Sequence, residues 1–436
     1  MPVAGLDVHK RVVEAVILDE DGRPRHRARF PCDRVALETF ARTHLSPAHR
    51  VALEATTNTW GITAILQPWV GEVVVSNPRR TRAIAEAKIK TDHVDALVLA
   101  QLLRCDYLPR VWQPDPATQA LRHLTSRRAA LVARRTGIKN RIHAVFHELL
   151  LAPPVRDLFG VSGRMWLRGV PLPPLARAAV DCELRLLEAV DSELATLTQH
   201  LAQRAHGDPQ VRLLMTLPGV DVAVAQMVLA TLGDVTRFRD GAHAAAYVGL
   251  VPATFQSAAH TYHGPITKQG KGHARWLLVQ AAQHLGTHPG PLGVFFRRLA
   301  RRKNRNVAVV ATARKLVVIA WHMLRRQEPY RYALPRATAV KLARLRIAAT
   351  GRRRAGGIPR GAPRPAAYGT GVGTFHVPSL AEVCARESLP PPQPLTPGER
   401  RVVTRTGTTA LVAELAQSYR ACRGRSARTR PPEESS

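Results

Sequence analysis

Four carboxylates in the first quarter of the chain have the types and spacing needed for acid–base or metal chemistry. Asp7 and Glu54 each lie within an apolar, strand-like segment. Burying a lone carboxylate is costly, so each of these two side chains needs a compensating partner. Asp92 and Asp95 are three residues apart on a predicted helix. They therefore project from one helix face, where two negative charges repel unless a cation lies between them.

A divalent cation is the simplest compensation. Four carboxylates from two strands and one helix suit a two-metal site, whose ions lie about 4 Å apart, activate a nucleophile and stabilise a phosphoryl transition state. Mg²⁺ is the expected ion, with Mn²⁺ as its substitute. In the competing interpretation, Asp7 pairs with Lys10. The two helical aspartates then face solvent beside Lys88 and Lys90. Spacing alone does not decide between the two interpretations.

The elements around these residues predict an α/β domain over residues 1–110. Alternating apolar residues, turn signals and helical periodicity mark its parts. The expected strands cover residues 5–18, 25–30, 50–55 and 72–76, and the expected helices cover 61–69 and 82–104.

The rest of the chain is expected to be all-α up to residue 330. Apolar residues recur at near-helical spacing over 117–151 and again over 175–204, which predicts a long helical hairpin within residues 111–206. Residues 207–330 predict a second, helix-rich domain. Residues 331–436 are rich in Arg and Pro and are expected to be mostly disordered, with one helix near 409–419.

The charge balance indicates a polyanionic partner. Lys and Arg total 64 against 32 Asp and Glu, a formal net charge of +32, while 45% of the residues are hydrophobic. That apolar content indicates a folded chain rather than a disordered polycation. Nucleic acid is the leading partner, because binding a polyanion releases its counterions; an acidic membrane surface is the lesser alternative.

The sequence shows no secretion signal or membrane span, since the apolar stretch 307–324 is interrupted by Arg314 and Lys315. The five cysteines lie far apart without a C-x-x-C pair, as expected for reduced thiols that hold no zinc. The predicted location is the cytoplasm, in association with the nucleoid.

One predicted helix carries a one-sided run of cations. No acidic residue interrupts it before Glu148. Its members are Arg122, Arg127, Arg128, Arg134, Arg135, Lys139 and Arg141. This pattern favours phosphate binding, although acids elsewhere, such as Glu183 and Glu188, could balance the charge. Because only 5% of the residues are aromatic, backbone recognition or pairing by a guide strand is favoured over base stacking.

A second nucleic-acid candidate is the segment Leu213–Phe238, which contains the turn Leu217-Pro218-Gly219-Val220. It is typical of a helix-hairpin-helix, in which backbone N–H groups around Gly219 would bind a phosphate irrespective of sequence. The alternative is an ordinary tight turn packed in the core.

Several motifs resemble a known family. These are Gly5-Leu6-Asp7-Val8-His9-Lys10, Glu54-Ala55-Thr56, Asn77-Pro78 and Lys90-Thr91-Asp92-His93-Val94-Asp95-Ala96. They resemble, in order and spacing, the DEDD transposases of the IS110 family, whose N-terminal domain is similar to the RuvC resolvase and has an RNase H-like fold. The resemblance implies that Asp7, Glu54, Asp92 and Asp95 form the metal-binding tetrad. One departure is Thr57, where the family usually has Gly.

Residues 249–275 resemble the C-terminal transposase domain of the same family. The matching residues are Gly249-Leu250-Val251-Pro252, Ser257, Ile266-Thr267-Lys268-Gln269-Gly270 and Arg275. The resemblance implies that Ser257 is the nucleophile that joins covalently to DNA. Lys268 would neutralise phosphoryl oxygens, and assistance from the acidic domain would activate the hydroxyl. Ala258 and Ala259 replace the usual Gly. In the alternative, Ser257 is a loop residue that bonds only its own backbone.

Together these features predict a site-specific DNA transposase, or recombinase, that contacts element ends and target DNA. The resemblance adds a bridge RNA as guide, and the breaking and rejoining of several strands suggests a homodimer or homotetramer. One rival function is a metal-dependent nuclease or junction resolvase in which water attacks. The other is a DNA-binding scaffold without catalysis, in which the carboxylates form structural ion pairs.

Overall fold

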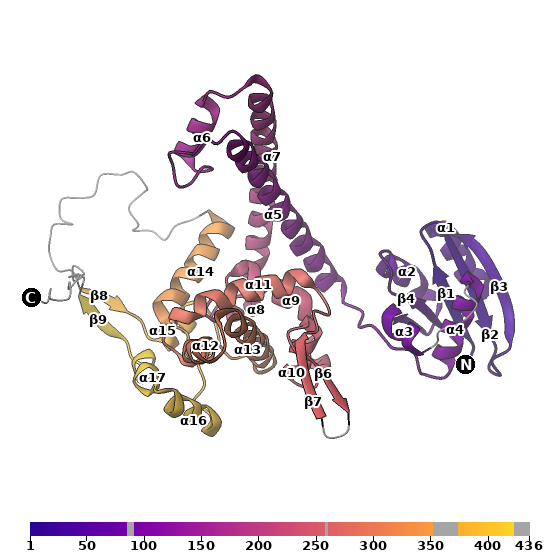
Figure 1. The fold of residues 1–436 in the computed structure, drawn as a ribbon. Helices are drawn as coiled ribbons and strands as arrows, with labels where there is room; N and C mark the ends of the chain where they lie inside the picture. The colour runs from indigo at the N-terminus through magenta and orange to yellow at the C-terminus, as the bar shows by residue number, and fades with distance from the viewer. Residues whose placement is uncertain (85–90, 258–259, 352–373, 423–436) are drawn as a thin grey trace, which may run out of the picture. The chain divides into compact units, whose positions relative to one another are not determined.

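A computed structural model describes residues 1–84, 91–257, 260–351 and 374–422 (Figure 1). The chain forms two compact units, Met1–Asp115 and Pro116–Ser436. Each unit is described below by itself.

The first unit is built on one five-stranded sheet. Its strands are β1 (Val3–Val8), β2 (Val12–Leu18), β3 (Pro24–Pro31), β4 (Arg50–Glu54) and β5 (Glu72–Ser76), in the order β3-β2-β1-β4-β5. β2 is antiparallel to β1 and β3, whereas β1, β4 and β5 are parallel. This confirms the expected mixed α/β architecture. The single strand expected over 5–18 is wrong, because a turn in which the Val12 carbonyl accepts from the His9 N–H divides it into β1 and β2.

Four α-helices accompany the sheet in the described residues: α1 (Arg34–His44), α2 (Thr59–Leu66), α3 (Pro78–Ile84) and α4 (Asp92–Arg104), with a 3₁₀ turn at Gln67–Trp69. The helix expected over 82–104 appears as α4, while residues 85–90 lie outside the described part. α1 was not predicted from the sequence; the Asp33 side chain caps it by accepting from the Ala36 N–H.

The two faces of the sheet bury different side chains. Ala4, Leu6 and Val8 join one hydrophobic cluster with residues of α1 and α2, and Val3 joins another with residues of α4. Gly5 lies where α4 comes closest, since a Cβ there would be 2.0 Å from the Ala96 carbonyl oxygen. The missing side chain therefore lets α4 sit directly on β1.

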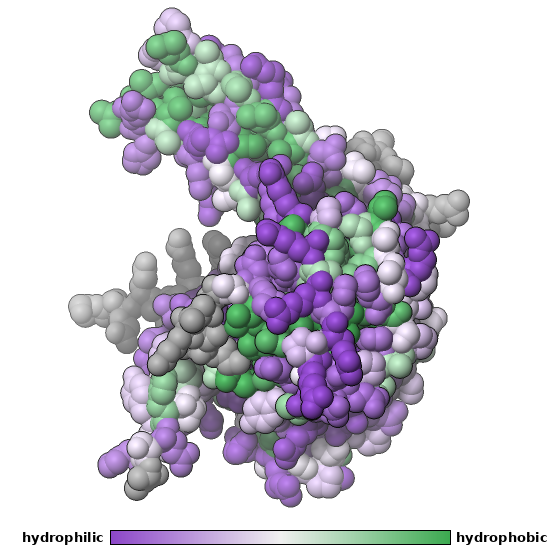
Figure 2. Space-filling model, turned by 90° about the vertical axis from the view of Figure 1, so that its right-hand side faces the viewer, coloured by the Kyte–Doolittle hydropathy of each residue, from purple (hydrophilic) through white to green (hydrophobic). Residues whose placement is uncertain are grey.

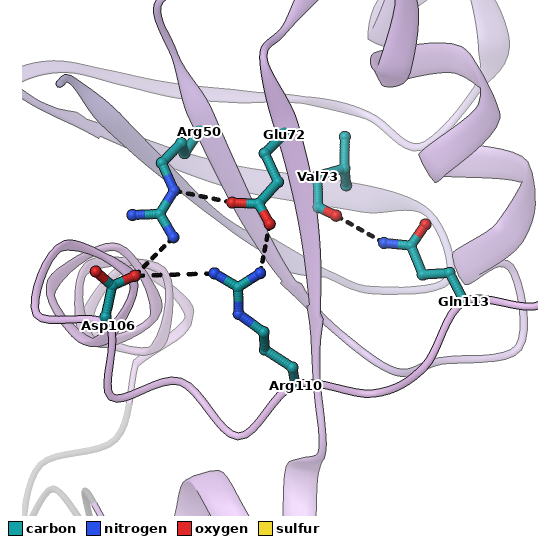
Figure 3. A network of polar contacts seen from close by, with 6 residues as sticks. All are labelled: Arg50, Glu72, Val73, Asp106, Arg110 and Gln113. Carbon is teal, nitrogen blue, oxygen red and sulfur yellow. Dashed lines mark hydrogen bonds and ion pairs between the residues drawn. The ribbon is translucent and has the colours of Figure 1, made fainter. Parts of the chain in front are cut away.

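A polar network ties the end of this unit to the sheet (Figure 3). The Arg50 guanidinium donates to Glu72 at 3.0 Å and to Asp106 at 2.7 Å. Arg110 also pairs with Glu72, and the Gln113 side chain donates to the Val73 carbonyl. The segment after α4 is thereby fixed against β4 and β5.

The second unit begins with two long helices, α5 (Pro116–Glu148) and α7 (Pro174–Gly207), which occupy the segments where the helical hairpin was predicted. The short helix α6 (Val161–Gly169) lies between them in sequence and packs through Leu167 into the cluster that holds Ile142 and Leu187. We call α6, the adjoining ends of α5 and α7, and the segments between them the arm. Apolar side chains gather on the arm (Figure 2). The most exposed of them are Leu150, Val161, Met165 and Leu175.

The remaining body is mainly helical, but the expectation that the chain is all-α up to residue 330 is wrong at residues 252–266, which form an antiparallel strand pair. It contains α8 (Pro209–Leu214), α9 (Val222–Leu232), α10 (Gly241–Val248), α11 (Gly272–Gln283), α12 (Pro291–Arg302), α13 (Arg305–Arg326), 3₁₀ turns at Val235–Arg237 and His284–Thr287, and a hairpin of β6 (Pro252–Ser257) and β7 (His260–Ile266). By length and composition α13 could cross a membrane, but 56% of its apolar window is buried within the protein, as in the core helix of a globular domain.

The expectation that residues 331–436 are mostly disordered is wrong for the described part of this segment. It contains α14 (Pro335–Thr350), β8 (Thr374–Val377), α15 (Leu380–Arg386), α16 (Pro397–Thr406), α17 (Thr409–Leu415) and β9 (Tyr419–Cys422). Leu342 and Leu345 of α14 are buried in the main core. α15 and α16 each begin with a capping box. Average composition hid these helices, because Arg and Pro runs separate them and each helix buries only a few apolar residues. Residues 352–373 and 423–436 lie outside the described residues.

Candidate functional site

The predicted carboxylates come from β1, β4 and the start of α4, and we call them, together with His9, the acidic corner. β1 and β4 are parallel neighbours with Leu6 opposite Leu53, so the next residues, Asp7 and Glu54, lie at the same strand ends and on the same face. That face is the one covered by α4. Asp92 and Asp95 occupy the first turn of α4, which the Thr91 side chain caps.

His9 bridges two members of the acidic corner. Its Nε2 atom lies 3.0 Å from Asp7 Oδ2 and 3.2 Å from Asp92 Oδ1. Ligand atoms of Asp7, His9 and Asp92 all lie within 4.8 Å of one another. Glu54 and Asp95 are not members of that tight group, and in the described residues the pairing partner of Asp7 is His9 rather than Lys10.

The electrostatics of the acidic corner favour a bound cation. Burial raises the pKa of Asp7, His9 lowers it, and repulsion from Asp95 and Asp92 raises it further, with a net increase. A divalent cation among these oxygens would remove that repulsion. Carboxylate oxygens are the ligands that Mg²⁺ and Mn²⁺ prefer, so the four carboxylates of the acidic corner fit the expected metal, with His9 as their hydrogen-bonding partner. The bridging position of His9 was not predicted, because a lone histidine gives no such signal in sequence.

Ser257 lies at the end of β6, opposite His260 of β7, and is exposed. Within the described residues its hydroxyl has no hydrogen-bonding partner that would act as a general base. Lys268, just beyond β7, is also exposed and adopts a φ of 53°. Arg275 instead has a structural role, since its guanidinium donates to the carbonyls of Val248, Gln269 and Gly270.

The basic run on α5 divides into engaged and open cations. Arg122 donates to the Ala230 carbonyl at 2.7 Å, Arg135 pairs with Asp191 at 2.7 Å, and Arg141 pairs with Glu183. Lys139 lies 4.6 Å from the centroid of the Phe159 ring. The alternative in which acids balance the run is therefore confirmed for Arg135 and Arg141, while Glu188 pairs with Arg168 of α6.

Three cations of the run stay open. Arg127, Arg128 and Arg134 make no ion pair within the part of the chain that the structure describes, and Arg127 and Arg134 are exposed. A broader signal was missed in the sequence: residues 241–327 contain thirteen Lys and Arg and no Asp or Glu. Such a stretch would attract a polyanion over most of the body of the second unit.

The turn at Gly219 has the properties of a packed structural turn. Gly219 has a φ of 76°, and a Cβ there would be 2.4 Å from the Ala281 carbonyl oxygen. Lys341 of α14 donates to the carbonyls of Leu217 and Val220. The Asp221 carboxylate already accepts from the start of α9, where a phosphate would have to bind. These contacts favour the packed-turn alternative over a phosphate-binding hairpin.

Comparison with known proteins identifies the family. The DEDD model of IS110, described as a transposase, matches residues 4–150, and a model described as a transposase of the IS116/IS110/IS902 family matches residues 211–292. The chain is similar to a probable family 20 transposase of Pseudomonas aeruginosa, with 29% identity over 237 residues, 52% of this chain and 68% of the relative.

Two further relatives are named for insertion elements. The transposase for IS1328 of Yersinia enterocolitica is 27% identical over 329 residues, 73% of this chain and 95% of the relative. The transposase for IS1111A of Coxiella burnetii is 26% identical over 249 residues, 56% of this chain and 68% of the relative. The first matched region contains the acidic corner, and the second contains the hairpin with Ser257. The chain therefore belongs to the IS110 family of transposases.

Proposed function

We propose that this protein is a site-specific DNA transposase that cuts and rejoins strands with the acidic corner and Ser257. The observation that carries the proposal is the convergence of Asp7 and Asp92 on His9, in a family of transposases and in a chain of net charge +32. Evenly distributed structural ion pairs would not place like charges together. This clustering argues against the scaffold function.

In the proposed reaction, Ser257 Oγ loses its proton and bonds to a phosphodiester phosphorus. The bond from phosphorus to the leaving strand oxygen breaks, and that oxygen takes up a proton. A strand hydroxyl later attacks the phosphoserine and releases Ser257, so the backbone is rejoined without an external energy source. When bound, Mg²⁺ or Mn²⁺ would supply charge neutralisation at the phosphoryl oxygens. Asp7, Glu54, Asp92 and Asp95 would hold the ion, and Lys268 would add a further positive charge.

Partners follow from the same proposal. The element ends and target DNA are the substrates, and a bridge RNA is the proposed guide, in the cytoplasm beside the nucleoid. The open cations Arg127, Arg128 and Arg134 are the proposed phosphate contacts of α5. Several strands must be cut and joined, which calls for a homodimer or homotetramer. The exposed apolar side chains of the arm, such as Val161 and Met165, support association between copies.

A second candidate is a metal-dependent nuclease or junction resolvase with water as nucleophile. The observation in its favour is that no described carboxylate or imidazole hydrogen-bonds the Ser257 hydroxyl. Under this function Ser257 is a bystander and no protein–DNA bond forms.

Covalent trapping separates the two functions. The full chain is incubated with Mn²⁺, labelled DNA carrying its element ends, and RNA transcribed from the adjacent noncoding DNA, and is then denatured. We expect the native protein and the control variant Ser162→Ala to give a labelled protein band after denaturation. The Ser257→Ala variant should give no such band. DNA cleavage by Ser257→Ala at the native rate would establish the water-dependent function instead.

A further inference from the structure

The β6–β7 hairpin presents an organised face around Ser257. Phe255 pairs with Tyr262 across the two strands, and Ser257 pairs with His260. Side chains alternate along a strand, while directly opposite residues share a face. Phe255, Tyr262, Ser257 and His260 therefore lie on one face of the ribbon.

The two aromatic side chains on this face have little contact with the rest of the protein. Phe255 is 64% exposed and Tyr262 is 65% exposed. Their ring centroids are 6.4 Å apart and the ring planes differ by 27°, so they form a nearly parallel pair. Rings so exposed contribute little to the core, and a two-stranded ribbon is marginally stable by itself. Their position therefore suggests a role in binding.

The surroundings of the ring pair determine the chemistry of its partner. The hairpin belongs to the acid-free stretch 241–327. Lys268 and Lys271 follow β7. Burial lowers the pKa of His273, and the positive charges of Arg128 on α5 and of Lys271 lower it further, so both cations act on this imidazole. An anionic partner with planar apolar surfaces fits this combination, and nucleic acid has both properties.

We propose that Phe255 and Tyr262 form a stacking platform for an unpaired base of the DNA strand whose phosphate reaches Ser257. The inference deepens the proposed function and rests on it for the identity of the reacting phosphate. Same-face neighbours on a strand are about 6.6 Å apart, which corresponds to about two nucleotides of rise. A base on the platform and the phosphate at Ser257 are therefore close neighbours along one strand.

The platform gives strand exchange a physical basis. Strands that change partners must leave their duplex, and the cost of unstacking is lowest for bases that are already unpaired. Stacking on the rings offsets that cost without reading the base, because every base has a π-face. The low overall aromatic content is compatible with this local role, since two rings suffice.

The test uses the full chain with Ser257→Ala, so that DNA is bound but not cut. The probes are a DNA duplex with a two-nucleotide mismatch bubble carrying 2-aminopurine and a fully paired duplex of the same length. We expect tighter binding of the bubble duplex, with quenching of 2-aminopurine by the rings. Adding Phe255→Ala and Tyr262→Ala should weaken bubble binding by about 5- to 100-fold and abolish the quenching, with paired-duplex affinity unchanged.

Matched variants separate stacking from general apolar contact. Tyr262→Phe keeps both rings and should bind as before, whereas Phe255→Leu with Tyr262→Leu keeps apolar bulk and should behave like the alanine pair. Tyr107→Ala removes an exposed ring from the first unit and is the control. Thermal unfolding checks that each variant is folded, and the leucine pair keeps the test valid if the alanine pair unfolds.

Three results would overturn the inference. The alanine and leucine pairs could still prefer the bubble duplex, or they could lose affinity equally for the bubble and the paired duplex. The third result is a change in oligomeric state that accounts for the lost affinity. The last would identify a second copy of the chain as the partner of the rings. Because every protein in this test lacks the Ser257 hydroxyl, the result is independent of covalent trapping. Failure of trapping alone would overturn the serine nucleophile and leave the platform intact.

Discussion

The acidic corner and the β6–β7 hairpin hold their chemical groups in opposite ways. Asp7 follows Leu6, which is fully buried, and lies where Gly5 lets α4 pack directly on β1. Ser257 ends a strand whose side chains are almost all exposed. The acidic corner is thus positioned by a hydrophobic core, whereas the hairpin is positioned mainly by its own strand pairing.

The difference suggests a division of labour. Clustered carboxylates must be held against their own repulsion, which requires rigid packing around them. A hydroxyl that attacks DNA must instead reach a large substrate, which an exposed ribbon permits. We therefore expect substitutions near the acidic corner to alter folding and metal binding, and substitutions on the hairpin to alter DNA reactions alone.

The largest expected effect comes from removing one group from each region. Asp7→Asn and Ser257→Ala should each lower strand joining by at least about a thousandfold, because each removes a group that acts as part of a unit. Only Asp7→Asn should also lose stabilisation by Mn²⁺. When the free Mn²⁺ concentration is one hundred times the Kd of the site, binding raises the free energy of unfolding by about 2.7 kcal/mol.

Thermal unfolding with and without Mn²⁺ measures this difference, and Asp21→Asn, an exposed aspartate on a turn, is the matched control. An equal Mn²⁺ shift in Asp7→Asn and the native sequence would show that the acidic corner does not hold the ion.

Two glycines test the packing side of the comparison. Gly5→Ala would place a Cβ 2.0 Å from the Ala96 carbonyl oxygen and 2.7 Å from the Ala100 nitrogen. Overpacking of this kind should destabilise the sheet by about 3 kcal/mol. In Gly264→Ala, on β7, the nearest atoms are at 3.7 and 3.8 Å, so the change should stay within about 0.5 kcal/mol.

Hydrogen exchange at the β1 and β7 amides reads the two regions separately. Comparable protection losses in the two variants would contradict the view that only the acidic corner depends on close packing.

How much the sequence predicted also differs between regions. The places of Asp7 and Glu54 on strands and of Asp92 and Asp95 on a helix were predicted correctly, because local motifs and strand and helix periodicity encode them. The link through His9 was not predicted, since it depends on the turn between β1 and β2. The engagement of Arg122 was not predicted either, because its acceptor, the Ala230 carbonyl, lies on α9 and long-range pairing leaves no local pattern. The pair of Arg141 with Glu183 was foreseen only as an alternative, since the sequence does not show which acid faces which cation.

A smaller effect is expected from a buried cation of the second unit. Burial lowers the pKa of Lys341 to about 8, and Asp221 opposes the shift. The unfolded chain therefore binds more protons between about pH 8 and 10.5, so the free energy of unfolding should rise with pH in that window and stay level below it. In Lys341→Met, the rise in the free energy of unfolding between these pH values should be smaller by up to about 3 kcal/mol.

Urea unfolding at several pH values measures the effect, and Lys268→Met, which removes an exposed lysine beside the hairpin, should keep the native pH dependence. If Lys341→Met retained the full rise, other groups would be its source.

The smallest expected effect is a difference in the salt dependence of DNA binding between two groups of α5 cations. One group is paired with acidic residues of the protein, and the other makes no ion pair within the described residues. Replacing Arg127 and Arg134 with Gln should weaken duplex binding and reduce the slope of log affinity against log salt concentration by about 2. The reason is that each arginine bound to a phosphate releases about one counterion from DNA. Replacing Arg135 and Arg141 with Gln should leave the slope nearly unchanged, since Asp191 and Glu183 already neutralise them. Fluorescence anisotropy across a salt series distinguishes the pairs. Equal slopes would mean that DNA displaces the internal acids, and the distinction between engaged and open cations would then fail.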